Sequence, residues 1–245
     1  MKRAALVMAG GNSGRMRAAG CKTHKALREI RGQSLIEHNL RKLFFFGMAD
    51  VIVAVNTAET ELRSWLSGAG ETLAASYGAQ LRIFVEERPL GTIGAAGSLA
   101  APNENLLVVN VDNLTDLDLR AFFDFHLENG AALTVASHQE PFSIPFGQLD
   151  ISGSRVTAYR EKPVFMITIS SGAYMLHRRA MAAIPPDQRT HAPDLIHLLI
   201  QSGEFVACFG HNAWWIDVND EVALALAEAE LARRPLASAA AGGHS

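Results

Sequence analysis

Short apolar runs alternate with amphipathic segments along the first half of the chain. The runs predict strands, three of them apolar enough to be buried on both faces. These strands are Arg3–Ala9, Val51–Val55, Arg82–Val85, Leu106–Asn110 and Leu133–Ala136. Helices are predicted over Ser34–Phe46, Thr60–Leu66 and Leu117–Asn129. The alternation indicates an α/β fold with a mostly parallel sheet and right-handed crossovers.

The third helix carries signals at both ends. Asp116 is expected to cap its N-terminus, and Gly130 follows its last residue, where a left-handed backbone is common. In open α/β sheets, ligands bind beyond the carboxyl ends of the strands. Side chains that directly follow the predicted strands are therefore candidates for chemistry.

The pattern changes after Pro141. Short strands are predicted at Gly147–Asp150, Arg155–Glu161, Thr168–Met175, Phe205–Phe209 and Ala213–Asp217. Helices are predicted at Arg178–Ile184, Asp194–Ser202 and Asp220–Arg233. Neither an internal repeat nor a long linker interrupts this order. We therefore expect one domain over residues 1–231 with a small β-rich insertion, and a disordered tail over 232–245.

The composition of the 245 residues narrows the classes of function. A net charge of −3 argues against nucleic-acid binding through bulk electrostatics, and leaves room for a local basic pocket. The two cysteines cannot form a disulfide framework, and the apolar N-terminal run is too short for a signal peptide. A cytoplasmic location is therefore expected. No run approaches the roughly 20 apolar residues of a membrane span, so no membrane partner is expected.

A glycine-rich segment follows the first strand directly, and residues 9–16 read AGGNSGRM. Glycines allow backbone N–H groups to approach phosphate oxygens closely, and Arg15 and Lys25 add positive charge. The spacing matches neither the GxGxxG nor the GxxxxGK[ST] pattern. A tight turn without a ligand is the alternative explanation, and the two cations favour phosphate binding.

This opening, followed by Lys25-Ala26-Leu27, resembles the start of sugar-1-phosphate nucleotidylyltransferases, whose pattern is AGGxGTRL and then a proline–lysine pair. Four more segments agree with the family, in its order: EERPLGTIG at 86–94, NVDNLTD at 110–116, EKP at 161–163 and WID at 215–217. The similarity covers residues 1–231 as a single nucleotidyltransferase domain. The segment at 86–94 is most similar to guanylyltransferases that act on mannose- or heptose-type phosphates.

The resemblance implies a Rossmann-like, mostly parallel mixed sheet flanked by helices, with a small β-rich insertion that binds sugar. It implies that a sugar 1-phosphate attacks the α-phosphate of a nucleoside triphosphate such as GTP, with Mg²⁺ as cofactor and pyrophosphate as leaving group. The expected partners are these two substrates. A homodimer is also possible, since Phe44–Phe46 and Ile216–Leu226 offer apolar surface.

The same resemblance assigns roles to individual residues. Arg15 and Lys25 are the expected catalytic cations, which contact the phosphates. Asp112 and Asp217 are the expected Mg²⁺ ligands, with helix capping as the alternative for each. Expected nucleotide contacts are Ala9, Gly10, Gly11, Asn12, Glu86, Gly91 and Thr92. Expected sugar-phosphate contacts are Gly147, Glu161, Lys162 and Ser170. A turn at 90–92 without base contact is equally compatible.

Five positions depart from the family pattern. Asn12-Ser13-Gly14 shifts a glycine, His24 replaces a proline and is expected to make the loop less rigid, and Val111 is expected to add bulk near the sugar. Ser170 replaces an asparagine, and Val218-Asn219 replaces isoleucine-glycine. Because the charged residues remain, we predict altered sugar specificity. Two alternatives stay open: an inactive homologue that senses or regulates through NDP-sugar binding, and a GT-A-like glycosyltransferase.

Overall fold

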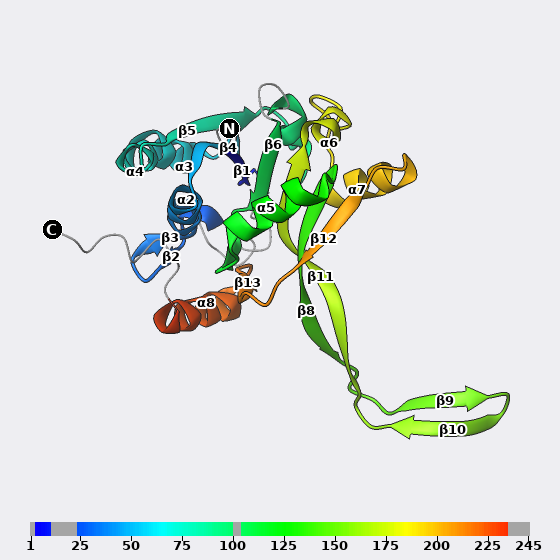
Figure 1. The fold of residues 1–245 in the computed structure, drawn as a ribbon. Coiled ribbons are helices and arrows are strands. Elements are labelled where there is room, and N and C mark those ends of the chain that lie inside the picture. The colour runs from blue at the N-terminus through cyan, green and yellow to red at the C-terminus, as the bar shows by residue number, and fades with distance from the viewer. Residues whose placement is uncertain (1–2, 11–23, 100–103, 235–245) are drawn as a thin grey trace.

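The computed structural model describes residues 3–10, 24–99 and 104–234. A seven-stranded sheet lies at its centre in the order β12-β8-β11-β6-β1-β4-β5 (Figure 1). Its strands are β1 (Arg3–Met8), β4 (Met48–Asn56), β5 (Gln80–Glu86), β6 (Asn105–Asn110), β8 (Leu133–Ser143), β11 (Val164–His177) and β12 (Val206–Gly210). Only β11 runs antiparallel to its neighbours within this sheet. The predicted α/β class with a mostly parallel mixed sheet is confirmed.

Helices cover both faces of the sheet because successive residues of its central strands point to opposite sides. Ala5 and Val7 of β1 belong to the core cluster that includes residues of α2 and α5, whereas Ala4 and Leu6 belong to the one that includes residues of α6 and α7. All four are buried. The helices are α2 (Leu35–Phe45), α3 (Thr60–Trp65), α4 (Glu71–Ser76), α5 (Leu119–Asn129), α6 (Arg178–Ala182), α7 (Ala192–Gln201) and α8 (Glu221–Arg233). Shorter helical turns are η1 (Lys25–Leu27), η2 (Leu66–Gly70) and η3 (Gly94–Leu99).

Three two-stranded units complete the fold. They are β2 (Glu29–Ile30) with β3 (Gln33–Ser34), β7 (Asn113–Thr115) with β13 (Trp215–Asp217), and β9 (Gln148–Ser152) with β10 (Arg155–Arg160). The β7–β13 pair places Asp217 opposite Asn113, next in sequence to Asp112. The predicted β-rich insertion is the β9–β10 hairpin at the end of a long β8–β11 ribbon, and it projects from the body (Figure 1).

The predicted N-cap of α5 is wrong. The helix begins at Leu119, and the carboxylate of Asp118 accepts hydrogen bonds from Arg120 N at 2.8 Å and Ala121 N at 3.0 Å. Residues 113–115 instead pair with β13, and this strand displaces the start of the helix beyond Asp116. At the other end, Gly130 adopts the predicted left-handed conformation, with φ of +59°.

The C-terminal boundary of the expected domain falls inside α8. Ala232 and Arg233 of the expected tail belong to this helix, and residues 235–245 lie outside the described residues. Within the described ranges, the helices are all too short or too polar to cross a membrane.

Candidate functional site

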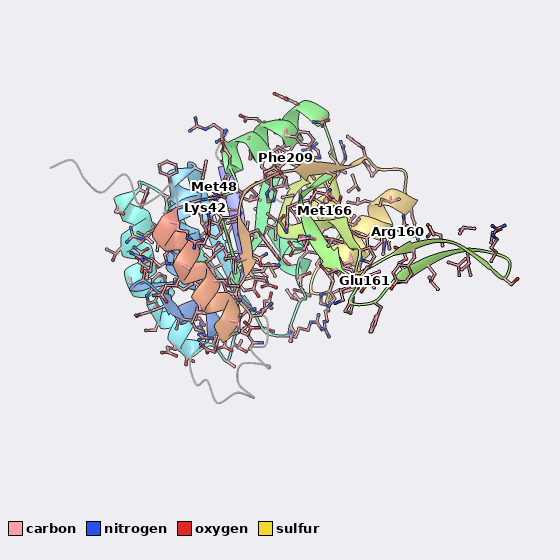
Figure 2. All side chains as sticks on the ribbon, turned by 90° about the horizontal axis from the view of Figure 1, so that it is seen from below. Lys42, Met48, Arg160, Glu161, Met166 and Phe209 are labelled. Carbon is pink, nitrogen blue, oxygen red and sulfur yellow. The ribbon has the colours of Figure 1, made fainter. Side chains whose placement is uncertain are left out.

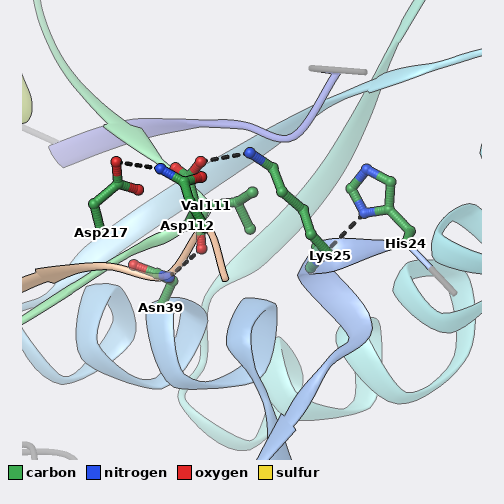
Figure 3. A network of polar contacts seen from close by, with 8 residues as sticks. His24, Lys25, Asn39, Val111, Asp112 and Asp217 are labelled. Carbon is green, nitrogen blue, oxygen red and sulfur yellow. Dashed lines mark hydrogen bonds and ion pairs between the residues drawn. The ribbon is translucent and has the colours of Figure 1, made fainter. Parts of the chain in front are cut away.

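Three of the predicted charged residues meet at the carboxyl edge of the sheet. Asp112 follows β6, and its Oδ2 accepts a hydrogen bond from Lys25 Nζ on η1. The two side chains are mostly buried, with 17% of Lys25 and 14% of Asp112 exposed. Val218 N donates to Asp112 O at 2.9 Å, which brings the end of β13 to the same place. In Figure 3, Asp112 lies between Lys25 and Asp217.

Polar side chains of α2 hold this edge in position. Asn39 Nδ2 donates to Val111 O at 3.0 Å and to Leu35 O at 3.1 Å, so it ties the residue before Asp112 to the helix (Figure 3). Lys42 Nζ donates to Thr115 O at 2.7 Å. Burial lowers the pKa of Lys42 to about 7, against the pull of Asp116 and Asp118. A buried lysine with one carbonyl partner is a structural tie in this position.

Two departures from the family pattern have clear structural roles. His24 is buried, and its Nδ1 accepts a hydrogen bond from Ala26 N at 3.1 Å, so it caps the turn that carries Lys25. A hydrogen bond here stands in for the restraint of a proline. Val111 is fully buried in the core cluster that includes residues of α2 and α5. The expectation that its side chain adds bulk near the sugar is wrong, because that side chain packs into the core.

A buried carboxylate lies beside the start of the glycine-rich segment. Glu86, the last residue of β5, is 2% exposed, and a Cβ on Gly10 would lie 2.4 Å from its Oε2. Only glycine therefore fits at position 10 with this carboxylate in place. Glu86 Oε2 accepts from Leu90 N at 3.4 Å, and Oε1 is buried with no hydrogen-bond partner in the described part of the chain. Burial raises the pKa of Glu86, and the Leu90 N–H opposes this.

Glu86 also lines a pocket of about 650 Å³. Its other lining residues are Phe84, Val85, Glu87, Arg88, Leu90 and Asp187. Pockets of this size accommodate small ligands. Glu86 thus combines a buried carboxylate beside Gly10 with a place in the lining of this cavity.

The turn after the pocket has a packing role of its own. Gly91 has φ of +83°, and a Cβ there would lie 2.4 Å from Thr190 O. Thr92 Oγ1 accepts from Ala192 N at 3.0 Å, at the start of α7. These contacts explain both residues without a ligand, and base contact by Gly91 and Thr92 stays a prediction. Ala9 is a core residue whose N–H donates to Ala54 O at 2.9 Å.

Ser170 is the only predicted sugar-phosphate residue in the described chain that lies near the Asp112 edge. Gly172, two residues on, packs so closely on Asn113 that a Cβ would lie 2.0 Å from Asn113 Nδ2. That nitrogen donates to Ser171 O at 3.0 Å. The exposed Ser170 therefore sits where β11 meets the segment that follows Asp112.

The other three predicted sugar-phosphate residues gather at the base of the β9–β10 hairpin. Tyr159 Oη donates to Glu161 Oε2 at 2.5 Å, and a Cβ on Gly147 would lie 2.1 Å from the same hydroxyl. Lys162 follows, with φ of +43°. The ribbon from Ser170 to Val164 spans about 20 Å at the rise of a β-strand. The structure thus separates this group from Asp112, and Figure 2 shows Glu161 far from Lys42 on α2.

Three predicted site residues, Gly11, Asn12 and Arg15, lie outside the described residues. The sequence interpretation missed a polar cluster at the same sheet edge. His138 Nδ1 lies 2.9 Å from Ser171 Oγ, which lies 2.7 Å from His211 Nε2. Burial lowers the pKa of His211, followed in effect by the nearby His138. His211 directly follows β12, so the rule on strand ends could have identified it, whereas His138 lies within β8 and gave no such signal.

The chain is thus an α/β protein with a mostly parallel sheet, and it carries two carboxylates and a lysine at the carboxyl edge of that sheet. The family model described as Nucleotidyl transferase matches residues 4–234, and the chain belongs to this family. The resemblance drawn from its motifs is confirmed.

Named relatives agree with this assignment. The chain is 26% identical over 222 residues to the mannose-1-phosphate guanyltransferase of Candida albicans, covering 87% of this chain and 60% of the relative. It is 26% identical over 248 residues to the mannose-1-phosphate guanylyltransferase of Mycobacterium tuberculosis, covering 98% and 67%. The chain thus spans about 60% of the length of its fungal relatives.

Solved structures share the fold. HddC from Yersinia pseudotuberculosis superposes with a TM-score of 0.70 at 20% identity, covering 94% of this chain and 99% of that one. A second structure of HddC, complexed with GMP-PN, superposes with a TM-score of 0.69 at 19% identity, with the same coverage.

Proposed function

We propose that this chain is a Mg²⁺-dependent guanylyltransferase, which joins GTP and a sugar 1-phosphate to give a GDP-sugar and pyrophosphate. The observation that carries the proposal is the meeting of Lys25, Asp112 and the end of β13 at one sheet edge. Family membership supports nucleotidyl transfer, and the names of the relatives support guanine and a mannose-type sugar.

The two carboxylates suit Mg²⁺. The ion prefers oxygen ligands and is commonly held by one or two carboxylates together with substrate phosphates. In the described part of the chain, no group of three or more His, Cys, Asp or Glu side chains could form an all-protein metal cage. Asp112 and Asp217 would therefore hold the ion against the triphosphate. Mg²⁺ bound there would withdraw charge from the α-phosphate.

The chain's own residues supply position and charge. The new bond joins an oxygen of the sugar phosphate to the α-phosphorus, and the bond from that phosphorus to the β-phosphate oxygen breaks with its electron pair. The attacking oxygen is already ionised, so no general base is needed. Lys25 brings a positive charge between two polyanions that repel each other, as such transfer requires. Arg15 is proposed to stabilise the leaving pyrophosphate.

Glu86 is proposed to select guanine. A carboxylate accepts two hydrogen bonds at once, and guanine presents two adjacent donors, the N1–H and the 2-amino group. Glu86 lines the pocket, and its buried Oε1, which has no hydrogen-bond partner among the described residues, suits this recognition. Adenine has no donor at N1 and would leave the buried oxygen unsatisfied, which carries a large penalty.

The proposal is tested by pyrophosphate release with Mg²⁺, with GTP, CTP, UTP, dTTP and ATP each paired with a panel of sugar 1-phosphates. We expect release with GTP and a mannose- or heptose-type phosphate. Release with another nucleotide would refute the guanine assignment. If no pair releases pyrophosphate and the chain still binds a GDP-sugar tightly, the proposal of an enzyme is wrong and that of an NDP-sugar sensor is supported.

The variant Glu86→Gln tests base selection in the same assay. The amide can accept from one guanine donor and turns its own NH₂ towards the other. We therefore expect kcat/KM for GTP to fall about 10–100-fold, as for a lost charged hydrogen bond. Glu128→Gln is the matched control, because Glu128 is exposed on α5 and is not among the residues that line the pocket. Equal activity of Glu86→Gln and Glu128→Gln would remove Glu86 from base recognition.

A further inference from the structure

Residues 139–169, which we name the arm, extend from the body as a β8–β11 ribbon that ends in the β9–β10 hairpin (Figure 1). The pairing of β8 with β12 and of β11 with β6 stops before the arm begins. Within the arm, β8 and β11 keep one register from Ile169 to Val164, and Ile144 N donates to Pro163 O at 3.0 Å beyond it. This continuous pairing holds the hairpin away from the chain's own body.

The hairpin has one apolar face. Val156 pairs with Ile151 and Tyr159 pairs with Leu149, so these four side chains point to the same side. They are 51–69% exposed. The opposite face carries polar side chains, among them Asp150 and Arg160, which form an ion pair at 2.8 Å. A two-stranded hairpin in water is marginally stable unless an apolar face is covered.

The arm carries most of the exposed large apolar side chains of the described chain. Ten of the seventeen exposed large apolar side chains in the described chain lie on the arm. They are Phe142, Phe146, Leu149, Ile151, Val156, Tyr159, Val164, Phe165, Met166 and Ile167. Alternation along β11 puts Phe165 and Ile167 on one face of the ribbon and Val164 and Met166 on the other, so the ten side chains do not form a single patch. At about 150–250 Å² for a fully exposed aromatic side chain and less for an aliphatic one, the four side chains of the hairpin's apolar face present on the order of 400–500 Å². An apolar patch of about 300–600 Å² is often functional, and with a polar rim it approaches the roughly 800 Å² that a standard interface buries per partner.

We propose that two copies of this chain pair through the apolar faces of their arms. An isologous contact lets one patch serve both partners, and two such faces pack as stacked sheets do. The charges of the arm balance: Glu140, Asp150 and Glu161 against Arg155, Arg160 and Lys162. Two arms therefore meet without net repulsion, and a polyanionic partner finds no net attraction.

The oligomeric state of the full chain tests this pairing by sedimentation equilibrium without substrate, so its outcome is independent of the proposed activity. We expect a dimer, and Ile151→Asp should raise its dissociation constant at least about 100-fold by placing an unpaired charge in the interface. Ser152→Asp is the matched control, because it adds the same charge at the next residue, on the opposite face. We expect Ser152→Asp to remain dimeric.

Val156→Lys provides a second disruption of the same face by the opposite charge, and far-UV circular dichroism checks that each variant is folded. Loss of the dimer in both Ile151→Asp and Val156→Lys, with retention in Ser152→Asp, supports the arm interface. A monomeric wild-type chain at tens of micromolar overturns the proposal and leaves another occupant for this face. A dimer that withstands both substitutions also overturns it, because another surface would then hold the copies together.

Discussion

Several contacts fix the position of Asp112 at the candidate site. It is mostly buried, pairs with Lys25, and has its backbone fixed by Val218 on one side and, through Val111, by Asn39 on the other. These contacts hold the carboxylate at the sheet edge before any ligand binds. It is therefore set in advance for a cation at this edge, as electrostatic preorganisation requires.

Asp112→Asn should lower turnover by on the order of 10²–10³ in the pyrophosphate assay, because the amide has lost the charge that holds the metal. The shape of the side chain is retained, so the fold should persist. Asp124→Asn is the control, since Asp124 is about half exposed and contacts Arg3 at 3.6 Å, away from the site. Near wild-type turnover in Asp112→Asn would refute its role as a metal ligand.

Single residues were predicted well where their chemistry follows from strand ends. Asp112 was expected directly beyond a strand, and the structure places it there, paired with Lys25. Their roles as metal ligand and catalytic cation stay predictions. His24 and Val111 were expected to change the site, whereas one caps a turn and the other packs in the core. Those roles depend on which way a side chain points after the chain turns, and motif spacing does not contain that information.

At the scale of elements, buried hydrogen bonds from one histidine connect α5 to the central sheet. His126 on this helix is 1% exposed, with Nδ1 at 2.7 Å from Thr134 Oγ1 and Nε2 at 3.1 Å from Asn105 Oδ1. It thereby links α5 to β8 and β6. Burial is the main cause that lowers its pKa to about 4.

The tie makes stability depend on pH. Between pH 6.5 and about 4 the unfolded chain binds a proton at His126 that the folded chain refuses, so the free energy of unfolding falls as the pH is lowered through this window. The contribution reaches about 3 kcal/mol. Urea unfolding at pH 7, 6, 5 and 4.5 gives the free energy of unfolding at each pH. This free energy should fall less steeply with decreasing pH in His126→Gln than in the wild type. His197→Gln, at an exposed position, should show the wild-type pH dependence, and the same pH dependence in all three proteins would contradict the assignment.

Helices and strands were predicted where one hydrophobic pattern runs through the whole element. Where glycine or proline interrupts the pattern, the predicted element ends too early. The helix predicted at Thr60–Leu66 continues through η2 and α4 in spite of Gly68 and Gly70. Gly70 has a packing role there, because a Cβ at this position would lie 2.8 Å from the side chain of Leu81. The strand predicted at Leu133–Ala136 continues to Ser143, past Pro141. Proline is tolerated there because the ribbon has a free edge.

At the scale of the whole molecule, the class of sheet followed from the alternation of strands and helices, but the strand order did not. The antiparallel β11 inserts between β6 and β8, and this places Ser171 against Asn113 although 58 residues separate them. The arm was predicted as an insertion at the sugar site. Its direction follows from a register between β8 and β11 that local patterns do not specify.

The order of strands in the sheet assigns the proposed nucleotide and the proposed sugar phosphate to different halves of the sheet. Gly10 and Glu86 belong to the parallel half with β1, β4 and β5, whereas Ser170 belongs to β11, on the other side of β6. Asp112 follows β6 and lies between the halves. With base contact by Gly91 and Thr92 as predicted, we expect a nucleotide at Glu86 to cover the turn at 91–94. We expect a sugar phosphate at Ser170 to cover the strand end at 170–172.

Hydrogen exchange on the full chain can separate these halves. GTP alone should slow exchange at residues 91–94, and the sugar 1-phosphate that supports turnover should slow it at 170–172, because a bound ligand excludes water from the amides that it covers. ATP is the control for the first half, since Glu86 is proposed to reject adenine. Protection of 170–172 by GTP alone, with none at 91–94, would place the nucleotide in the opposite half of the sheet and contradict the proposed base site.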